Sequence, residues 1–133
     1  MKLIKAVNAY MAMSILSKEK MKFKDALNLT MAKNKLKESY EFFASQEKDI
    51  VLSTCKKDNN GVPIKFSDGH FEFENEEARN KYKKDMEELS SIEIPEKDYL
   101  TVVISPPPTI SVELIEALDG FVFFEEAPSE GAS

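Results

Sequence analysis

The sequence has little of what most catalytic and metal sites need. It contains one cysteine, Cys55, one histidine, His70, and no tryptophan. A single cysteine excludes an internal disulfide, and without a second histidine or a cysteine pair the usual zinc sites lack ligands. Four glycines in 133 residues supply neither a GxGxxG loop nor a P-loop for phosphate. The chain therefore carries no complete catalytic motif, and we expect a protein without a cofactor.

Long apolar runs are also missing. Runs such as VVI and FVFF are far short of the roughly 20 residues that a membrane-spanning helix needs. The opening MKLIKAVNAYMAMSIL has a faint similarity to a signal peptide, but Asn8 and Tyr10 interrupt it and no small-residue cleavage site follows. We interpret it as a helix and expect a cytoplasmic protein with no membrane segment.

Arginine is almost absent, because Arg79 is the only one among 18 basic residues. Arginine is the usual bidentate reader of phosphate and guanine, so the composition disfavours direct binding of nucleic acid.

The charge is divided along the chain. Residues 1–57 hold 12 bases and 6 acids, whereas residues 58–133 hold 6 bases and 18 acids, which together give the net charge of −6. In one interpretation the basic and acidic elements pack against each other, within one fold or across a homodimer. In the other, an exposed acidic face docks on a basic partner and speeds association.

The first third of the chain has a helical pattern. The opening helix presents Leu3, Val7, Tyr10 and Ser14 on one face. A longer helix is predicted to start near Lys24–Asp25, with Asp25 as its cap. The two helices form an αα-hairpin in this interpretation. The stripe on the longer helix consists of Leu29, Ala32, Leu36, Tyr40, Phe43, Ile50 and Thr54.

The stretch IKFSDGHFEF, residues 64–73, predicts a β-hairpin after the turn cluster Asp58–Gly61. With Asp68 and Gly69 at the two turn positions, Lys65 faces Glu72 as an opposite-charge pair. The same register puts four apolar residues on one face, namely Ile64, Phe66, Phe71 and Phe73. We interpret these rings as part of the scaffold and surface charge as the functional part of the protein. We interpret His70 as an exposed residue, which is unsuited to acid–base catalysis because a general base needs a shielded position.

An acidic helix follows, capped by Asn75 and buried along Ala78, Tyr82, Met86 and Leu89. IEIP and YLTVVI favour short extended segments, and Pro106–Pro108 forms a spacer. A last helix begins after Ser111 and ends at Asp119–Gly120, and FVFFEE is either a strand or a continuation of that helix. The predicted fold is thus one α+β domain over residues 1–126, with a disordered tail at 127–133.

Four phrases together cover most of the chain. They are MKLIKAVNAYMAM, ALNLTMAKNKLKESYEFF, DGHFEFENEEARNKYKKDMEELSSIEI and ISVELIEALDGFVFFEE. In these phrases and their order, the chain resembles a bacteriophage family without assigned function, domain of unknown function 1617. The proline spacer and the SEGAS tail fit that family less well. The resemblance implies a phage or prophage origin and an accessory role inside the host cell, and it transfers no catalytic residue.

These features favour a non-enzymatic phage accessory protein that binds a host or phage protein. The sharpest version is an anti-CRISPR-like inhibitor of a host defence system, whose partner contacts Glu76, Glu77, Glu87 and Glu88. Two alternatives stay open. One is a virion or tail-assembly component that forms homo-oligomers through apolar helix faces. The other is an enzyme with an unfamiliar metal site, for which His70, Glu72 and Glu74 are the candidate ligands on one strand face.

Overall fold

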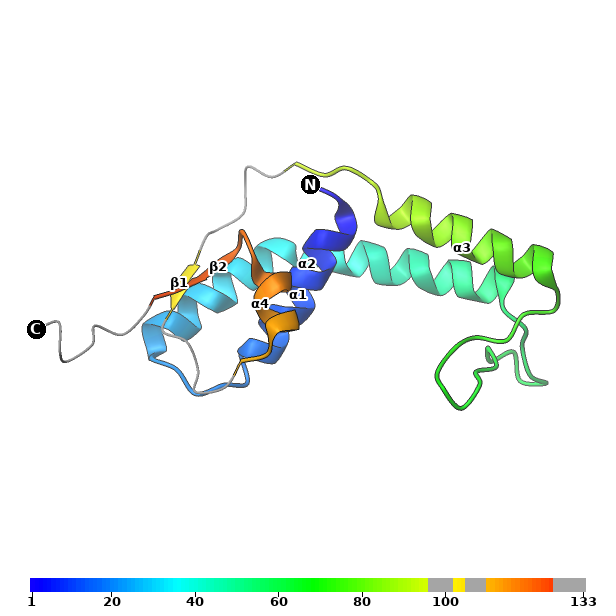
Figure 1. Ribbon diagram of the computed structural model, residues 1–133, viewed down its shortest axis with the longest axis horizontal. Helices are drawn as coiled ribbons and strands as arrows, with labels where there is room; N and C mark the ends of the chain where they lie inside the picture. The colour runs from blue at the N-terminus through cyan, green and yellow to red at the C-terminus, as the bar shows by residue number, and fades with distance from the viewer. Residues whose placement is uncertain (96–101, 105–109, 126–133) are drawn as a thin grey trace, which may run out of the picture.

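The computed structural model describes residues 1–95, 102–104 and 110–125. They form a mixed α+β domain dominated by helices (Figure 1), which confirms the predicted fold class. The elements are α1 (Leu3–Leu16), α2 (Phe23–Thr54), α3 (Glu76–Ser90), β1 (Val102–Ile104), α4 (Val112–Leu118) and β2 (Val122–Phe124). The predicted proline spacer and the predicted tail at 127–133 lie outside the described residues.

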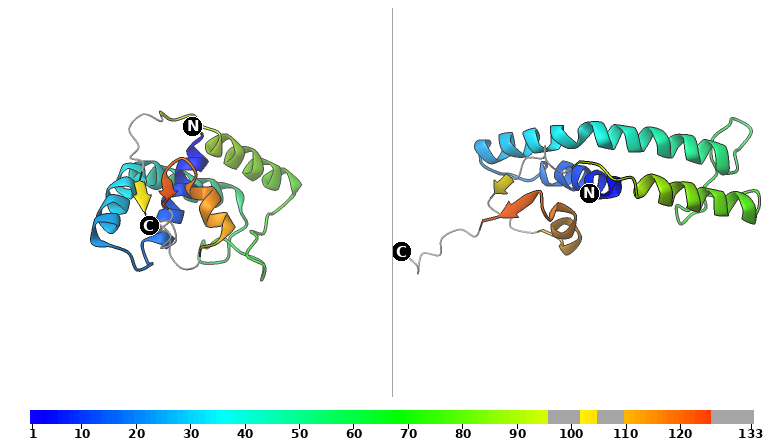
Figure 2. Two further views of the ribbon diagram at one scale, coloured as in Figure 1. Left: turned by 60° about the vertical axis from the view of Figure 1, so that its left-hand side comes forward. Right: turned by 90° about the horizontal axis from the view of Figure 1, so that it is seen from above.

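Helix α2 is the longest element and runs through most of the molecule (Figure 1). Its 32 residues contain neither glycine nor proline, so nothing in the sequence interrupts a helix of roughly 48 Å at 1.5 Å per residue. Helix α1 packs along its first half and α3 along its second half (Figure 2). The αα-hairpin predicted for α1 and α2 is confirmed.

Two hydrophobic clusters hold these helices together. The larger lies at the N-terminal half of α2, where Leu29, Ala32 and Leu36 meet residues of α1, α4, β1 and β2. The smaller lies where the start of α1 meets the end of α3, and it contains Leu3, Val7, Phe43 and Leu89. Tyr10 and Tyr40 stack between α1 and α2 with their ring centroids 4.3 Å apart.

Helix α1 is buried on more sides than its sequence stripe predicted. Ala6, Ala9 and Ala12 are buried in addition to the predicted Leu3 and Val7. The cause is visible from above, because α1 lies between α2 on one side and α4 on the other (Figure 2). Small alanine side chains let helices approach closely, so α1 fits this central place.

The C-terminal elements form a β–α–β unit on α1. Strands β1 and β2 pair in parallel, with Val102 beside Val122 and Ile104 beside Phe124. Residues FVFFEE therefore open with a strand, the first of the two predicted possibilities. Ser111 caps α4 by accepting a hydrogen bond from the backbone N–H of Leu114, and Gly120 adopts the predicted left-handed conformation at φ 87°.

The N-terminus is joined to the segment after α3. The backbone N–H of Leu3 donates to the carbonyl of Ile92 at 2.7 Å, and that of Ile94 donates to Met1 at 2.8 Å. The terminal ammonium also lies 3.3 Å from the Glu93 carboxylate. These bonds hold the start of α1 against the end of α3.

The predicted cap of α2 is wrong. The helix begins at Phe23, Lys22 occupies the cap position, and no side chain caps the first turn. Asp25 lies inside that first turn, where its charge still favours the positive end of the helix dipole.

Among the described residues, no helix combines the length and the apolar composition needed to cross a bilayer. Helix α2 has the length, but charged residues are spread along it.

The larger core predicts a clear difference between two leucines of α2. Leu36→Ala removes a side chain with 0% exposure, so we expect the free energy of unfolding to fall by about 2–5 kcal/mol. Leu27→Ala is the matched control, because Leu27 is 59% exposed on the same helix and its loss changes stability by less than about 0.5 kcal/mol. Urea unfolding followed by circular dichroism measures both, and equal losses would contradict the described burial.

Candidate functional site

Residues 56–73 form a small meander beyond the end of α2. Two tight turns reverse the chain, and each has glycine in the left-handed region, Gly61 at φ 77° and Gly69 at φ 89°. The Asp58 carboxylate accepts hydrogen bonds from the backbone of Asn60 and Val62, as the predicted turn cluster requires. Isolated bridges rather than continuous strands shape this segment: Lys57 pairs with Pro63, and Lys65 pairs with Phe71. Another isolated bridge joins Lys2 at the N-terminus to Glu93.

The hairpin exists, but its predicted register is wrong by one residue. Lys65 pairs with Phe71, and the backbone N–H of Phe66 donates to the carbonyl of His70 at 2.8 Å. The two-residue turn would require positive φ at both Asp68 and Gly69, whereas only Gly69 has it. The loop is instead the three-residue kind that ends in a glycine bulge.

This shift changes the side-chain partners. Lys65 places its ammonium 4.9 Å from the centroid of the Phe71 ring, and Glu72 pairs with Lys56 at 3.6 Å. The predicted Lys65–Glu72 pair is therefore wrong. The predicted apolar face is wrong as well, because a slip of one residue moves side chains to the opposite face of a strand.

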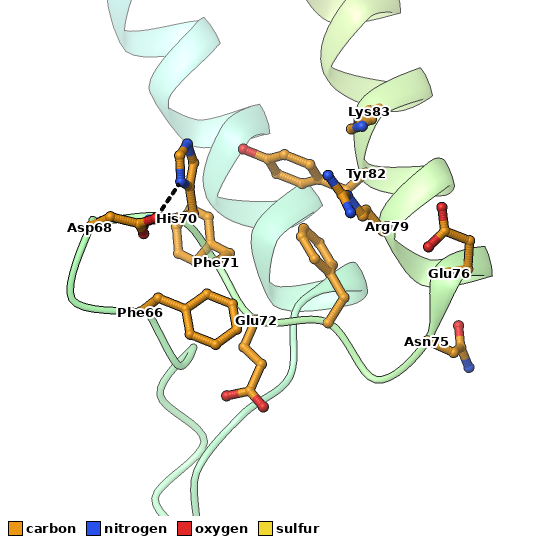
Figure 3. A pocket seen from close by; sticks show the side chains of 12 residues that line it. Phe66, Asp68, His70, Phe71, Glu72, Asn75, Glu76, Arg79, Tyr82 and Lys83 are labelled. Carbon is orange, nitrogen blue, oxygen red and sulfur yellow. Dashed lines mark hydrogen bonds and ion pairs between the residues drawn. The ribbon is translucent and has the colours of Figure 1, made fainter.

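An open hollow of about 770 Å³ lies between this hairpin and α3 (Figure 3). Its aromatic lining comes from Phe66, Phe71 and Phe73 of the hairpin and Tyr82 of α3. Phe73 and Tyr82 pack with centroids 5.2 Å apart, and Phe71 meets Tyr82 at 6.1 Å. Burial raises the pKa of Tyr82, and the charges of Glu47 and Cys55 add to the rise, so its hydroxyl stays protonated near neutral pH.

The interpretation of these rings as core needs correction. None of the three phenylalanines belongs to either hydrophobic cluster, and Phe66 is 54% exposed. Phe71 and Phe73 are half-buried against Tyr82 and support the first half of α3. The rings thus line a surface as well as supporting the fold.

Two cations stand on the α3 side of the hollow, Arg79 and Lys83, one helical turn apart. Among the described residues, neither makes an ion pair. The acids of the hairpin side already have partners, because Glu72 pairs with Lys56 and Asp68 with His70. The hollow therefore offers an aromatic surface with unpaired positive charge at one edge.

His70 lies on the edge of the hollow, and its side chain is 84% exposed. Its Nδ1 atom is 3.0 Å from the Asp68 carboxylate. A dashed line marks this contact in Figure 3. Hydrogen bonds from the His70 backbone and imidazole lower the pKa of the Asp68 carboxyl. The pair stabilises the turn, but water surrounds the imidazole, whereas a general base needs a shielded position.

The candidate metal ligands are not assembled. Within residues 1–95, 102–104 and 110–125, no three side chains of His, Cys, Asp or Glu lie close enough together to hold a metal ion. Of the predicted trio, Glu72 pairs with Lys56, and His70 pairs with Asp68.

The four predicted partner-binding acids are exposed but do not form one patch. Glu76 and Glu77 occupy the first turn of α3, and Glu76 lines the hollow. Glu87 and Glu88 lie 11 residues further on, about 16 Å along the helix at 1.5 Å per residue. Basic residues stand between the two pairs, and one of them, Lys81, bonds to Asp85 at 2.8 Å. Only the first pair is close to the hollow.

Sequence reasoning missed Arg79, Lys83 and Tyr82 as possible surface residues of one site. Tyr82 was recognised only as part of a buried stripe, and Arg79 only as the sole arginine. Their spacing on one helix, with Arg79 and Lys83 four residues apart, was the available signal.

Comparison with known proteins adds no relative. No family model matches the chain, and the searches of curated proteins and of solved structures found no match. The resemblance to the phage family therefore stays a prediction.

The surroundings of Cys55 predict that its thiol reacts slowly. Cys55 is 4% exposed. Burial raises the pKa of its thiol and outweighs the hydrogen bond with Thr54 and the charge of Lys57, which both lower it. At pH 8 we expect a disulfide reagent to label the folded protein many times more slowly than the urea-unfolded chain. Equal rates would contradict the described burial.

Proposed function

We propose that this protein is not an enzyme and acts by binding another protein through the hollow between the hairpin and α3. The observation that carries the proposal is the aromatic lining with two unpaired cations at its edge. Aromatic and arginine side chains supply most of the binding energy at protein interfaces, where they contact pockets and grooves. An exposed Phe66 and an unpaired Arg79 have this character.

The chemistry of the hollow indicates what the partner presents. Phe66, Phe71, Phe73 and Tyr82 favour an apolar or aromatic side chain, and Arg79 favours a carboxylate next to it. Glu76 and Glu77 at the start of α3 favour a basic residue beyond that carboxylate. The partner segment therefore carries an apolar residue between charges of both signs.

The resemblance to a phage family suggests where such a partner occurs. In this proposal the protein works in the cytoplasm of a bacterial host and binds a host or phage protein. An inhibitor of a host defence system is the sharpest version. Its acidic contact surface is then the Glu76–Glu77 pair, because Glu87 and Glu88 lie too far along α3 to share one small site with the hollow.

A second candidate function is self-association as an assembly component. The observation that favours it is the exposure of large apolar side chains on three helices: Met11 and Ile15 on α1, Phe23, Leu27 and Met31 on α2, and Val112 and Ile115 on α4. Such residues on neighbouring turns are typical of contact surfaces. A homodimer or larger homo-oligomer would cover them.

Substitutions at the hollow test the first proposal. We expect Phe66→Ala and Arg79→Glu each to weaken capture of partners from a bacterial host lysate by about tenfold or more, as loss of a major interface contact does. Reversal of Glu76 and Glu77 to lysine weakens capture as well. Quantitative pull-down with the purified tagged protein, followed by titration of the captured partner, measures these changes.

Matched variants outside the hollow provide the controls. Phe42→Ala removes a phenylalanine with 48% exposure on α2, and Lys84→Glu reverses a cation on the same helix as Arg79. Both are expected to keep the partner, as is the reversal of Glu87 and Glu88. If the Phe66 and Arg79 variants bind every partner as the unchanged protein does, the hollow is not the binding surface.

A further inference from the structure

We propose that copies of this chain associate head to tail, with the N-terminal end of α2 of one copy seated in the groove between α1 and α4 of the next. The inference rests on the second candidate function, self-association, and specifies its geometry. It concerns two surfaces that the hollow at the other end of the molecule does not use.

The first surface is a groove of about 530 Å³ between α1 and α4. Its apolar lining includes Met11 at 44% exposure and Ile15 at 53%, together with Leu114. Among the described residues that line it, the charged side chains are two carboxylates, Glu113 and Glu116. The groove therefore accepts apolar side chains that have positive charge beside them.

The second surface is a stripe on the first turns of α2. Phe23, Leu27 and Met31 follow one another at intervals of four residues and are 94%, 59% and 48% exposed. Exposed lysines accompany the stripe, namely Lys20, Lys22 and Lys24, and Lys35 continues its line one turn after Met31. From Lys18 to Lys24 the only acid is Glu19.

The two surfaces match in chemistry and in length. Lysines outnumber the nearby acids Glu19 and Asp25 around the stripe, whereas the groove has two carboxylates, so the net charges of the two surfaces are opposite. The stripe spans nine residues, about 13 Å of helix, and α4 has seven residues, about 10 Å. Phe23 is 94% exposed, so a partner surface can bury nearly all of its ring.

Within one copy of the chain, the stripe and the groove do not contact each other. Leu29 of α2 is 1% exposed in the core, and two residues rotate a helix by about 200°, so Leu27 points away from the core. Helix α1 separates α2 from α4, as the view from above shows (Figure 2). The stripe of one molecule therefore has to meet the groove of another.

A contact between two different surfaces has a consequence for assembly. It is heterologous, so each copy keeps one free stripe and one free groove, and growth continues until a ring closes or a chain extends. The area is small compared with permanent interfaces, so we expect association that increases with protein concentration and weakens as salt screens the charges.

Two variants that each disable one surface test this arrangement. Glu113→Lys with Glu116→Lys reverses the charge of the groove, and Phe23→Asp with Leu27→Asp removes the apolar stripe. Sedimentation velocity is expected to show concentration-dependent oligomers of the unchanged protein and a monomer for each variant alone. When the two variants are mixed, an intact stripe meets an intact groove, so the mixture forms a one-to-one dimer and nothing larger.

The control reverses two acids elsewhere, Glu87→Lys with Glu88→Lys on α3, and is expected to associate as the unchanged protein does. Circular dichroism confirms that each variant folds. If the unchanged protein stays monomeric at every concentration, self-association itself fails. If it associates but the variants do so equally, or if their mixture stays monomeric, self-association stands and the head-to-tail arrangement is overturned.

Discussion

The packing of α1 against the first half of α2 is the contact on which the other elements depend. Leu16 and Met13 of α1, with Leu29 and Leu36 of α2, are at most 1% exposed. The remaining elements at this end are a seven-residue helix and two three-residue strands, too short to be stable in water alone. They gain stability only by burying Val102, Ile104, Leu118 and Val122 on this helix pair.

The same helix pair explains why the molecule has two different ends. Because α2 continues well past α1, its second half is covered by α3, and the meander of residues 56–73 extends beyond both. The meander has its own hydrogen bonds, but single bridges rather than continuous strands link its segments, and none of its residues is buried. Segments with these properties open locally more easily than a packed core, which suits a surface that adapts to a partner.

The elements that the sequence predicted well are those with local causes. Asn75 caps α3 by accepting a hydrogen bond from the backbone of Ala78. Of the predicted stripe on α3, Leu89 is buried, and the other three members are half-buried. The unbroken second helix and the left-handed Gly120 are further examples. Cap chemistry, apolar period and glycine at a helix end act over a few residues, so they can be recognised without knowledge of the fold.

The failures came where one pattern fits two geometries or where distant segments meet. Asp-Gly suits both a two-residue turn and a three-residue loop. In the structure Asp68 does not have a positive φ, so the loop is the three-residue kind. The burial of α1 beyond the predicted stripe follows from α4, which comes about 100 residues later. For the same reason the hollow was not foreseen, because hairpin rings and Arg79 meet only once α3 folds back beside α2.

Native-state hydrogen exchange tests most directly whether a helix-pair core supports a separate, less stable binding end. The account predicts that amides of α1 and of α2 between Leu29 and Phe43 exchange slowest, at rates set by global unfolding. Amides of the meander, such as those of Phe66 and Glu72, are predicted to exchange faster through local opening. If the meander were as strongly protected as α1, the division into a stable core and an adaptable end would be contradicted.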